Sequence, residues 1–273
     1  MARERVLITV KTYPTLSQSH VELVCTAGFR EDGSWVRIYP VPFRLMDRDQ
    51  QFAKWTWVEL PLVRRTKDKR PESHSPADRN DITVGAKVPT DGEWRQRREI
   101  ALQRGRVWTD LTKLIEAGKR DEVSLATFKP ARMLGFEWQA AEEANWDAAK
   151  VAAVEAQLRQ RDFFDAEAVN DDFRPVRKLP WDFYYRFADE QGRESRMRIL
   201  DWEIGALYWG LADKGHPPAT VLEKVRAKYE DDFFAKDLHL FLGTTYEWHS
   251  RAPNPWVIIG VFPPPIPKQL ELL

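Results

Sequence analysis

The chain has 273 residues, of which 43% are hydrophobic and 12% aromatic, and its 42 basic residues balance its 42 acidic ones. This composition excludes an intrinsically disordered chain, which combines low hydrophobicity with a large net charge. It also excludes a protein that binds nucleic acid through an overall positive charge, so any such contact needs a local basic patch.

The lone cysteine and the short apolar runs indicate where the protein works. Cys25 cannot form an internal disulfide or a zinc site built on paired cysteines. The apolar run at residues 6–10 is shorter than the core of a signal peptide, and no run approaches the roughly 20 apolar residues of a membrane span. We therefore expect a cytoplasmic protein that does not cross a membrane.

Short strands dominate the first part of the chain. Alternating apolar residues predict the opening strand. Gly33 lies between two further apolar segments and can take the positive φ of a tight hairpin turn. Strands are therefore expected at residues 5–11, 22–27, 34–39 and 55–63.

The following segment is polar and interrupted by proline. Residues 66–92 predict a long exposed loop with a short strand at 82–84, and long loops of compact domains often carry function. Five of the seven residues 64–70 are basic. Arg64, Arg65 and Arg70 are therefore candidates to hold the phosphates of a nucleic acid, and the alternative is an ordinary solvated surface.

Helices and strands mix in the middle of the chain. The spacing of apolar residues predicts helices at 93–104 and 109–118, strands at 123–128 and 133–138, and an acidic helix at 145–161. The acidic helix is a candidate docking surface for a protein partner. The expected domains are an N-terminal domain at 1–141, an acidic helix and linker at 142–178, and a C-terminal domain at 179–273.

The second half repeats this mixture. We expect a hairpin at 181–188 and 195–200, helices after Asp201 and from Pro217, and strands at 237–243 and 256–262. Short antiparallel strands that alternate with helices in two closely packed halves predict the α+β class.

Two candidate binding sites lie on or after the early strands. Lys11 and Tyr13 follow the opening strand and can hold a phosphate and stack on a base, although an ordinary turn is the alternative. Arg37 and Tyr39 point to the same face of a strand. Such a pair can contact a phosphate and stack on a base, or can simply face solvent.

Two further candidates lie in the second half. Asp201 and Glu203 stand where a strand meets a helix, and a carboxylate there could stabilise a sugar cation or activate water. The alternative is that they only cap the helix.

The last predicted pocket surrounds the end of a late strand. His239 and His249 are candidate assisting groups, and the alternative is that each is an ordinary surface or core histidine. Thr244 and Thr245 offer two hydroxyls to a ligand. Two histidines ten residues apart do not make a metal site, and no cofactor is expected.

Several segments resemble a poorly characterised bacterial family associated with phage-defence and DNA-modification loci. The resemblance spans nearly the whole chain and is carried by residues 6–14, 22–28, 33–40, 128–130, 201–207 and 237–244. It implies an activity like that of anti-phage DNA glycosylases that remove modified bases. The Gly-Gln-Asp and His-Pro-Ser signatures of uracil-excising glycosylases are missing, so no catalytic residue carries over from them.

These observations predict a DNA-acting defence enzyme. The expected reaction is excision of modified bases from phage DNA, with the target nucleotide flipped out and a carboxylate assisting hydrolysis. One alternative is a reader of modified or structured nucleic acid without turnover. Another is a subunit of a defence complex that docks through the acidic helix.

Overall fold

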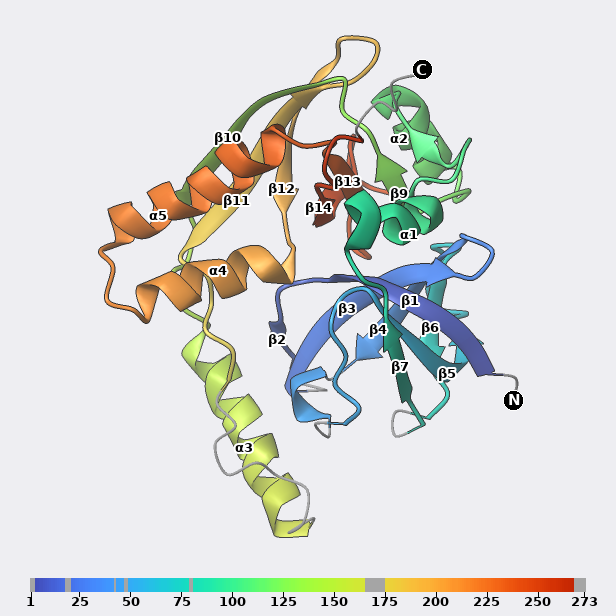
Figure 1. Ribbon diagram of the computed structural model, residues 1–273. Coiled ribbons are helices and arrows are strands. Elements are labelled where there is room, and N and C mark those ends of the chain that lie inside the picture. Colours follow the sequence, from blue (N-terminus) through green and yellow to red (C-terminus); the bar gives the residue numbers. More distant parts are fainter. Residues whose placement is uncertain are drawn as a thin grey trace.

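The computed structural model describes residues 3–17, 21–41, 43–46, 49–78, 81–164 and 175–267. In this part of the chain, strands gather in two seven-stranded sheets, the first from residues 3–87 and the second from residues 107–262, and five α-helices lie around them (Figure 1). The predicted α+β class is confirmed.

The first sheet closes on itself. Its strands follow the order β1-β3-β4-β6-β5-β7, and β5 also pairs with β1, while β2 pairs with β3. We call this sheet the barrel. Its strands are β1 (Arg3–Lys11), β2 (Thr15–Ser17), β3 (Val21–Arg30), β4 (Trp35–Val41), β5 (Thr56–Arg64), β6 (Ser73–Pro76) and β7 (Thr83–Lys87).

The alternation in β1 explains why the barrel has two apolar sides. Val6 and Ile8 point into the barrel, where they join a buried cluster with Val36 and Leu60. Leu7 points the other way and packs in a cluster shared with the second sheet. The strand is therefore buried on both faces, as its continuous apolar run requires.

The expected early strands and the hairpin turn are confirmed, but the expected exposed loop over residues 66–92 is wrong in part. Within it, β6 pairs in parallel with β4 and antiparallel with β5. Asp68 and Arg70 before β6 are buried, because they satisfy each other's charge. The polar sequence of this segment predicted exposed side chains, but Asp68 and Arg70 can both be buried because their opposite charges pair.

The second sheet mixes parallel and antiparallel neighbours in the order β10-β11-β12-β14-β13-β9-β8. Its strands are β8 (Val107–Trp108), β9 (Leu125–Phe128), β10 (Arg132–Ala140), β11 (Trp181–Ala188), β12 (Glu194–Ile199), β13 (His239–Thr244) and β14 (Trp256–Phe262). The pairs β12–β14 and β8–β9 are parallel and the others antiparallel.

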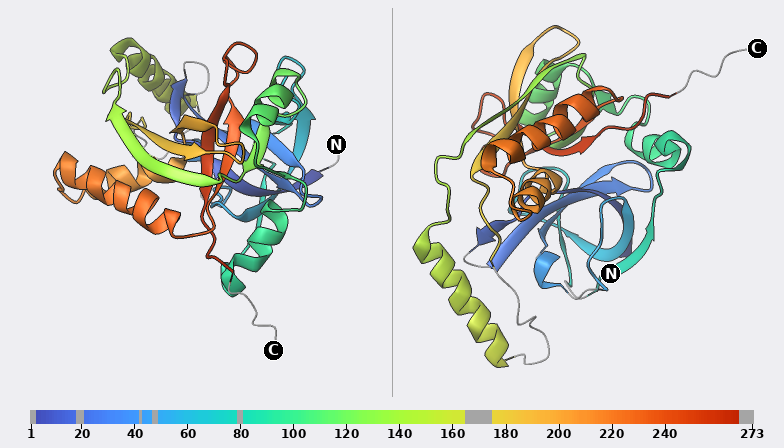
Figure 2. Two further views of the ribbon diagram at one scale, coloured as in Figure 1. Left: turned by 90° about the horizontal axis from the view of Figure 1, so that it is seen from above. Right: turned by 60° about the vertical axis from the view of Figure 1, so that its left-hand side comes forward.

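The helices connect and cover the strands. They are α1 (Asp91–Ala101), α2 (Leu111–Lys119), α3 (Ala148–Phe164), α4 (Trp202–Ala212) and α5 (Pro218–Arg226), with a 3-10 turn η1 (Phe43–Leu45) and a π-helical turn η2 (Ala227–Asp232). Apolar residues of α2, α4 and α5 share one buried cluster with the second sheet. By contrast, α3 projects from the body of the molecule (Figures 1 and 2).

The barrel and the second sheet are joined by a common apolar layer. Leu7, Phe29 and Trp55 of the barrel half pack with Phe241 and Phe262 of the second sheet. Beside this layer, the amide of Tyr13 donates to the carbonyl oxygen of Leu200 at 2.8 Å. The two halves therefore meet through both apolar packing and backbone hydrogen bonds.

Strands β8–β10 belong to the second sheet although they precede residue 141, so the expected division at that residue falls inside this sheet. The acidic helix forms as α3, while residues 165–174 of the expected linker lie outside the described residues. The docking role of α3 stays a prediction. No helix in the described part of the chain is both long and apolar enough to cross a membrane.

Candidate functional site

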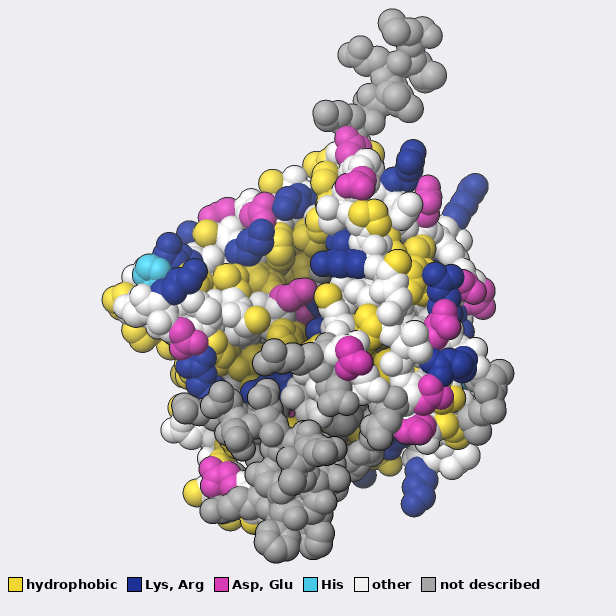
Figure 3. All heavy atoms as spheres, turned by 60° about the horizontal axis from the view of Figure 1, so that its bottom comes forward, with side chains coloured by type: hydrophobic (Ala, Val, Ile, Leu, Met, Phe, Trp, Pro, Cys, Tyr) yellow, Lys and Arg dark blue, Asp and Glu magenta, His cyan; other side chains and the backbone are white. Residues whose placement is uncertain are grey.

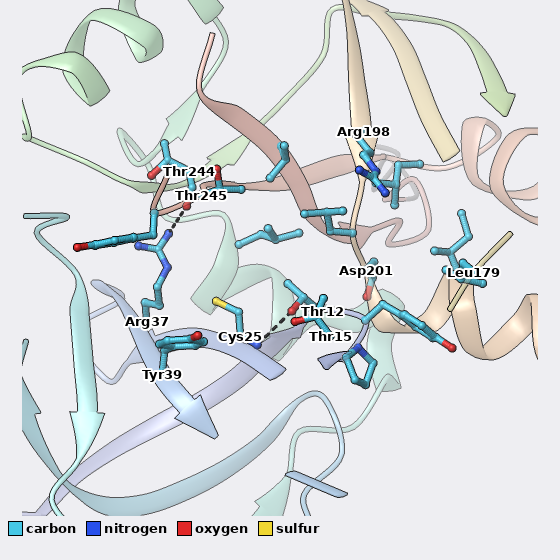
Figure 4. A pocket seen from close by; sticks show the side chains of 18 of the residues that line it. Thr12, Thr15, Cys25, Arg37, Tyr39, Leu179, Arg198, Asp201, Thr244 and Thr245 are labelled. Atoms are coloured by element: carbon cyan, nitrogen blue, oxygen red, sulfur yellow. Dashed lines mark hydrogen bonds between the residues drawn. The ribbon is translucent and has the colours of Figure 1, made fainter. Parts of the chain in front are cut away.

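A cleft of about 600 Å³ lies where the barrel meets the second sheet, and we call it the interdomain cleft. It receives side chains from β3, β4, β11, β12 and β14 and from the ends of β1 and β13 (Figure 4). Its lining residues are Thr12 to Thr15, Cys25, Arg37, Tyr39, Arg65, Lys67, Asp68, Arg70, Trp146, Lys178, Leu179, Trp181 to Phe183, Arg198 to Asp201, Ile204, Thr244 to Tyr246, Val257 and Ile259.

Arg37 is buried at the junction of the two halves. Its guanidinium donates to Ser124 Oγ at 2.8 Å, to the Ser124 carbonyl oxygen at 3.0 Å and to the Thr244 carbonyl oxygen at 3.3 Å. These acceptors are neutral, and burial together with the nearby Arg70 lowers the pKa of Arg37. Arg37 thus ties β4 to β13 and adds positive potential to the cleft.

Arg70 completes this basic end from the loop before β6. Its guanidinium donates to both carboxylate oxygens of Asp68, at 2.9 and 2.7 Å, and to the Thr244 carbonyl oxygen at 2.7 Å. Burial alone would raise the pKa of Asp68, but hydrogen bonds from Arg70 and Ser73 hold it well below its usual range. The pair is a fixed structural element in the cleft wall.

Tyr39 and Arg65 form a more accessible part of the wall. The Arg65 guanidinium lies 5.0 Å from the centre of the Tyr39 ring and donates to the Tyr39 carbonyl oxygen at 2.7 Å. Both side chains are half-buried. An aromatic ring next to an arginine is suited to a flat ring beside a phosphate.

The opposite end of the cleft combines aromatic rings with a second set of charges. Trp181 lies here beside Asp182, which forms an ion pair with Arg198. Lys178 lies 5.5 Å from the ring centre of Trp146. Between the two ends, Ile199, Val257 and Ile259 provide an apolar floor.

Thr244 and Thr245 carry unused hydrogen-bonding capacity. Among the described residues, neither hydroxyl has a hydrogen-bond partner, although both oxygen atoms are buried. Buried hydroxyls are normally paired, so each calls for an explanation. Their position in the cleft makes a ligand one source of the missing partners.

Asp201 lies in the cleft wall but is completely buried. One carboxylate oxygen accepts from Lys54 Nζ at 2.7 Å and from the Glu203 amide at 3.4 Å, and the other accepts from the Val261 amide at 3.2 Å. Burial raises the pKa of Asp201 to about 6, although Lys54 acts in the opposite direction. The carboxylate therefore caps α4 and ties the two halves together.

Glu203 lies outside the cleft lining. It reaches Lys54 Nζ at 2.5 Å from the solvent side, and its own side chain is 56% exposed. Lys54 thus lies between one buried and one exposed carboxylate. The predicted alternative, that Asp201 and Glu203 serve the start of a helix, agrees with this arrangement.

The structure brings eight of the predicted site residues to the interdomain cleft and leaves the others elsewhere. The eight are Tyr13, Arg37, Tyr39, Arg65, Arg70, Asp201, Thr244 and Thr245. Lys11 instead donates to the Phe52 carbonyl oxygen at 3.0 Å, and burial with the nearby Lys54 lowers its pKa to about 8. Arg64 donates to the Ser73 carbonyl oxygen at 2.7 Å and holds β6.

The two candidate histidines also lie away from the cleft. His239 is buried, its Nδ1 lies 2.8 Å from the Asp237 carbonyl oxygen, and burial lowers its pKa to about 4. His249 is buried with Nε2 2.9 Å from a carboxylate oxygen of Asp121. Neither side chain lines the interdomain cleft.

Sequence reasoning missed most of one end of the cleft. Trp181, Asp182 and Arg198 had no local motif, because the ion pair of the last two joins neighbouring strands. The regular alternation of Arg196 and Arg198 along β12 was the available signal, since it places both side chains on one face of the strand.

Two family models match the chain, and both are described as domains of unknown function. The first, DUF8758, matches residues 2–103, and the second, DUF8757, matches residues 108–273. No curated protein matches the chain. The two matches correspond to the barrel with α1 and to the second sheet with its helices. Because the second match covers more than half of the chain, this protein belongs to the family defined by the domain of unknown function DUF8757.

Proposed function

We propose that the protein binds nucleic acid and accepts one unpaired nucleotide in the interdomain cleft. The observation that carries the proposal is the composition of the cleft wall. Figure 4 places Arg37 and Tyr39 on one side of the cleft and Leu179 and Arg198 on the other. The Trp181 ring and the apolar side chains of Ile199, Val257 and Ile259 also line it. A volume of about 600 Å³ falls within the range of small-molecule sites and suits one nucleotide.

The charges around the cleft support this assignment. Arg65 and Lys67 line the cleft and form no ion pair with any described residue. Lys178 and Arg198 also line it, and they pair with Glu143 and Asp182. Basic and acidic side chains are interspersed on the face shown in Figure 3, in keeping with the zero net charge of the chain. Arg65 and Lys67 supply the local positive charge that a neutral protein needs to contact phosphates.

The barrel offers a second argument. Small closed barrels of five strands are a frequent scaffold for binding single strands through one face. Here β1, β3, β4, β6 and β5 form a closed ring, and β3 and β4 turn Cys25, Arg37 and Tyr39 toward the cleft. The likeness supports the proposal by architecture, whereas the cleft supports it by chemistry.

The test compares two tryptophan variants in the binding of a labelled oligonucleotide. Trp181→Ala removes a ring that lines the cleft, and we expect affinity to fall by about 1–3 kcal/mol, the usual effect of losing one base stack. Trp138→Ala is the matched control, because Trp138 packs on the same apolar cluster but does not line the cleft. Equal affinities of both variants, at equal thermal stability, would refute the proposal.

Base excision is a second candidate for the same cleft. It is favoured by Asp182, a carboxylate in the wall beside Trp181, and by the raised pKa of Asp201. Both oxygens of Asp201 are already hydrogen bonded, whereas Asp182 pairs with Arg198 through one oxygen, so Asp182 is the better placed of the two to act on a sugar. The resemblance noted above makes DNA with modified bases the substrate to try.

The excision test uses phage DNA with modified cytosines and an unmodified control, incubated without metal. Abasic sites that form only in the modified DNA, and disappear with Asp182→Asn while binding persists, would establish the reaction. DNA that is retarded on a gel but stays intact would favour the alternative, a protein that binds modified DNA without turnover.

We also propose a cytoplasmic location, which the unpaired Cys25 supports.

A further inference from the structure

A second, smaller pocket adjoins the interdomain cleft at its basic end. It has a volume of about 380 Å³, and we call it the turn pocket because the turn after β13 forms one side of it. Its lining residues are Lys67, Asp68, Lys69, Arg70, Tyr246, Glu247, His249, Ser250 and Arg251. Lys67, Asp68, Arg70 and Tyr246 line both pockets, so the two share a wall.

The turn pocket has an excess of accessible positive charge. Lys67, Lys69 and Arg251 are exposed, and they form no ion pair with any residue that the structure describes. Arg70 and Asp68 neutralise each other at 2.7 Å. Only the exposed Glu247 opposes the three free cations, so the pocket favours an anionic ligand.

The turn also presents two large aromatic rings to solvent. Tyr246 is 66% exposed and Trp248 is 52% exposed, which is unusual for side chains with so much apolar surface. The Tyr246 ring stands at the boundary of the two pockets, with the Arg70 guanidinium 5.6 Å from its centre. Exposed rings beside cations are the arrangement on which successive bases of a single strand stack.

Unsatisfied polar atoms occur on both sides of Tyr246. The hydroxyl of Thr245 lines the interdomain cleft, and His249 lines the turn pocket. Within the described part of the chain, Thr245 Oγ1 and His249 Nδ1 are buried without a hydrogen-bond partner. Buried polar atoms are normally paired, so the walls on both sides of Tyr246 contain a polar atom whose partner is missing among the described residues.

We propose that the turn pocket binds the nucleotide next to the one in the interdomain cleft, so that the ligand is a single strand that crosses Tyr246. This inference rests on the proposed function. A duplex that flips out one nucleotide keeps the neighbouring nucleotide paired. Two adjoining pockets separated by one ring therefore require two consecutive unpaired nucleotides.

Each side chain has a defined part in this arrangement. Lys67 is shared by both pockets and contacts the phosphate between the two nucleotides. Lys69 and Arg251 contact the next phosphate, and Tyr246 stacks on a base. The residues of the turn pocket thus position the strand and select an unpaired one.

The experiment measures the affinity of the full chain for two labelled DNA ligands of one sequence, a single strand and a duplex with one unpaired base. The single strand is expected to bind more tightly by at least about 10-fold. Tyr246→Ala is expected to weaken single-strand binding by about 5-fold to 100-fold, as loss of one base stack does. Binding of the bulged duplex should be weakened by a clearly smaller factor, because Tyr246 is one of many residues around its unpaired base in the cleft and no second unpaired base enters the turn pocket.

Tyr184→Ala is the matched control. Tyr184 of β11 packs against Arg196 of β12 and lines neither pocket. A second readout is 2-aminopurine placed next to the target base, whose fluorescence should be quenched on binding by the native protein and not by Tyr246→Ala. Lys69→Ala should make the slope of log affinity against log salt concentration shallower by about one for the single strand, as expected for the loss of one phosphate contact.

The outcomes separate this inference from the proposed function. Equal affinities for both ligands, with Tyr246→Ala weakening neither or both alike, would overturn the turn pocket as a nucleotide site. Trp181→Ala would still weaken binding in that case, so the proposed function would stand. Failure of every nucleic acid to bind would overturn both.

Discussion

Burial changes what individual ionisable residues can do in this protein. The sequence predicts His239 as an assisting catalytic group, and the structure places it on β13 against Asp237 with the ring almost completely buried. Asp201 is buried as well, but its pKa moves upward. Burial makes the charged form of each group more costly, so the pKa of His239 falls and the pKa of Asp201 rises to about 6, below neutral pH.

His239 should make stability depend on pH. Burial lowers its pKa from 6.5 to about 4, so between these values the unfolded chain binds a proton that the folded protein does not. This contribution is complete above pH 6.5 and is lost as pH falls toward 4, by up to about 3 kcal/mol. Chemical denaturation of native protein and His239→Gln at several pH values measures it.

The difference between the two proteins is the informative quantity, because Asp201 acts in the opposite direction over part of the same range. The native protein should lose stability relative to His239→Gln as pH falls from 6.5 to 4. A constant difference across this range would contradict the shifted pKa of His239.

At the scale of elements, the closeness of β1 to β3 depends on a glycine. Gly28 of β3 pairs with Ile8 of β1 beside an irregularity in the register of β1. A Cβ at Gly28 would overlap the carbonyl oxygen of Leu7, which is backbone and cannot turn aside. Glycine within a strand often marks such a close backbone approach.

Gly28→Ala should therefore destabilise the protein by about 3 kcal/mol, near the upper end of the usual cost of overpacking. Gly210→Ala in α4 is the control. An added Cβ there meets no atom within 4 Å, and alanine in a helix should stabilise by up to about 1 kcal/mol. Thermal unfolding of both variants is the measurement, and an unaffected Gly28→Ala would show that the strands can separate without cost.

At the scale of the whole molecule, a buried ion pair joins the two halves. Lys54 comes from the barrel half, and Asp201 stands at the start of α4. Both side chains are buried, and Asp201 also holds the Val261 amide of β14. The pair therefore orients the second sheet against the barrel and shapes the wall of the interdomain cleft.

Lys54→Met should lower stability by about 3–5 kcal/mol, because it leaves the Asp201 carboxylate buried without a cation. Adding Asp201→Asn should recover part of the loss, since asparagine still caps the helix and carries no charge. Arg120→Met breaks the exposed pair with Glu122 and should leave the unfolding midpoint nearly unchanged. If Lys54→Met loses no more stability than Arg120→Met, the ion pair between Lys54 and Asp201 does not hold the two halves together.

Local patterns were enough to predict much of the fold and part of the site. The alternation of Val6, Ile8 and Val10 and the turn at Gly33 led to the correct strands, because neighbouring residues alone set these signals. Arg37 and Tyr39 were found as candidates for the same reason. The cleft that holds them could not be found, since its opposite wall comes from residues 178–201.

The sequence by itself determined the α+β class, the positions of the longer strands and helices, and the absence of net charge. Only the tertiary structure decided which residues share a cleft. It paired Arg70 with Asp68, buried Asp201 against Lys54 and placed Tyr246 between two pockets. The physical reason is range: backbone preferences act over a few residues, whereas desolvation and ion pairing depend on chain segments that only folding brings together.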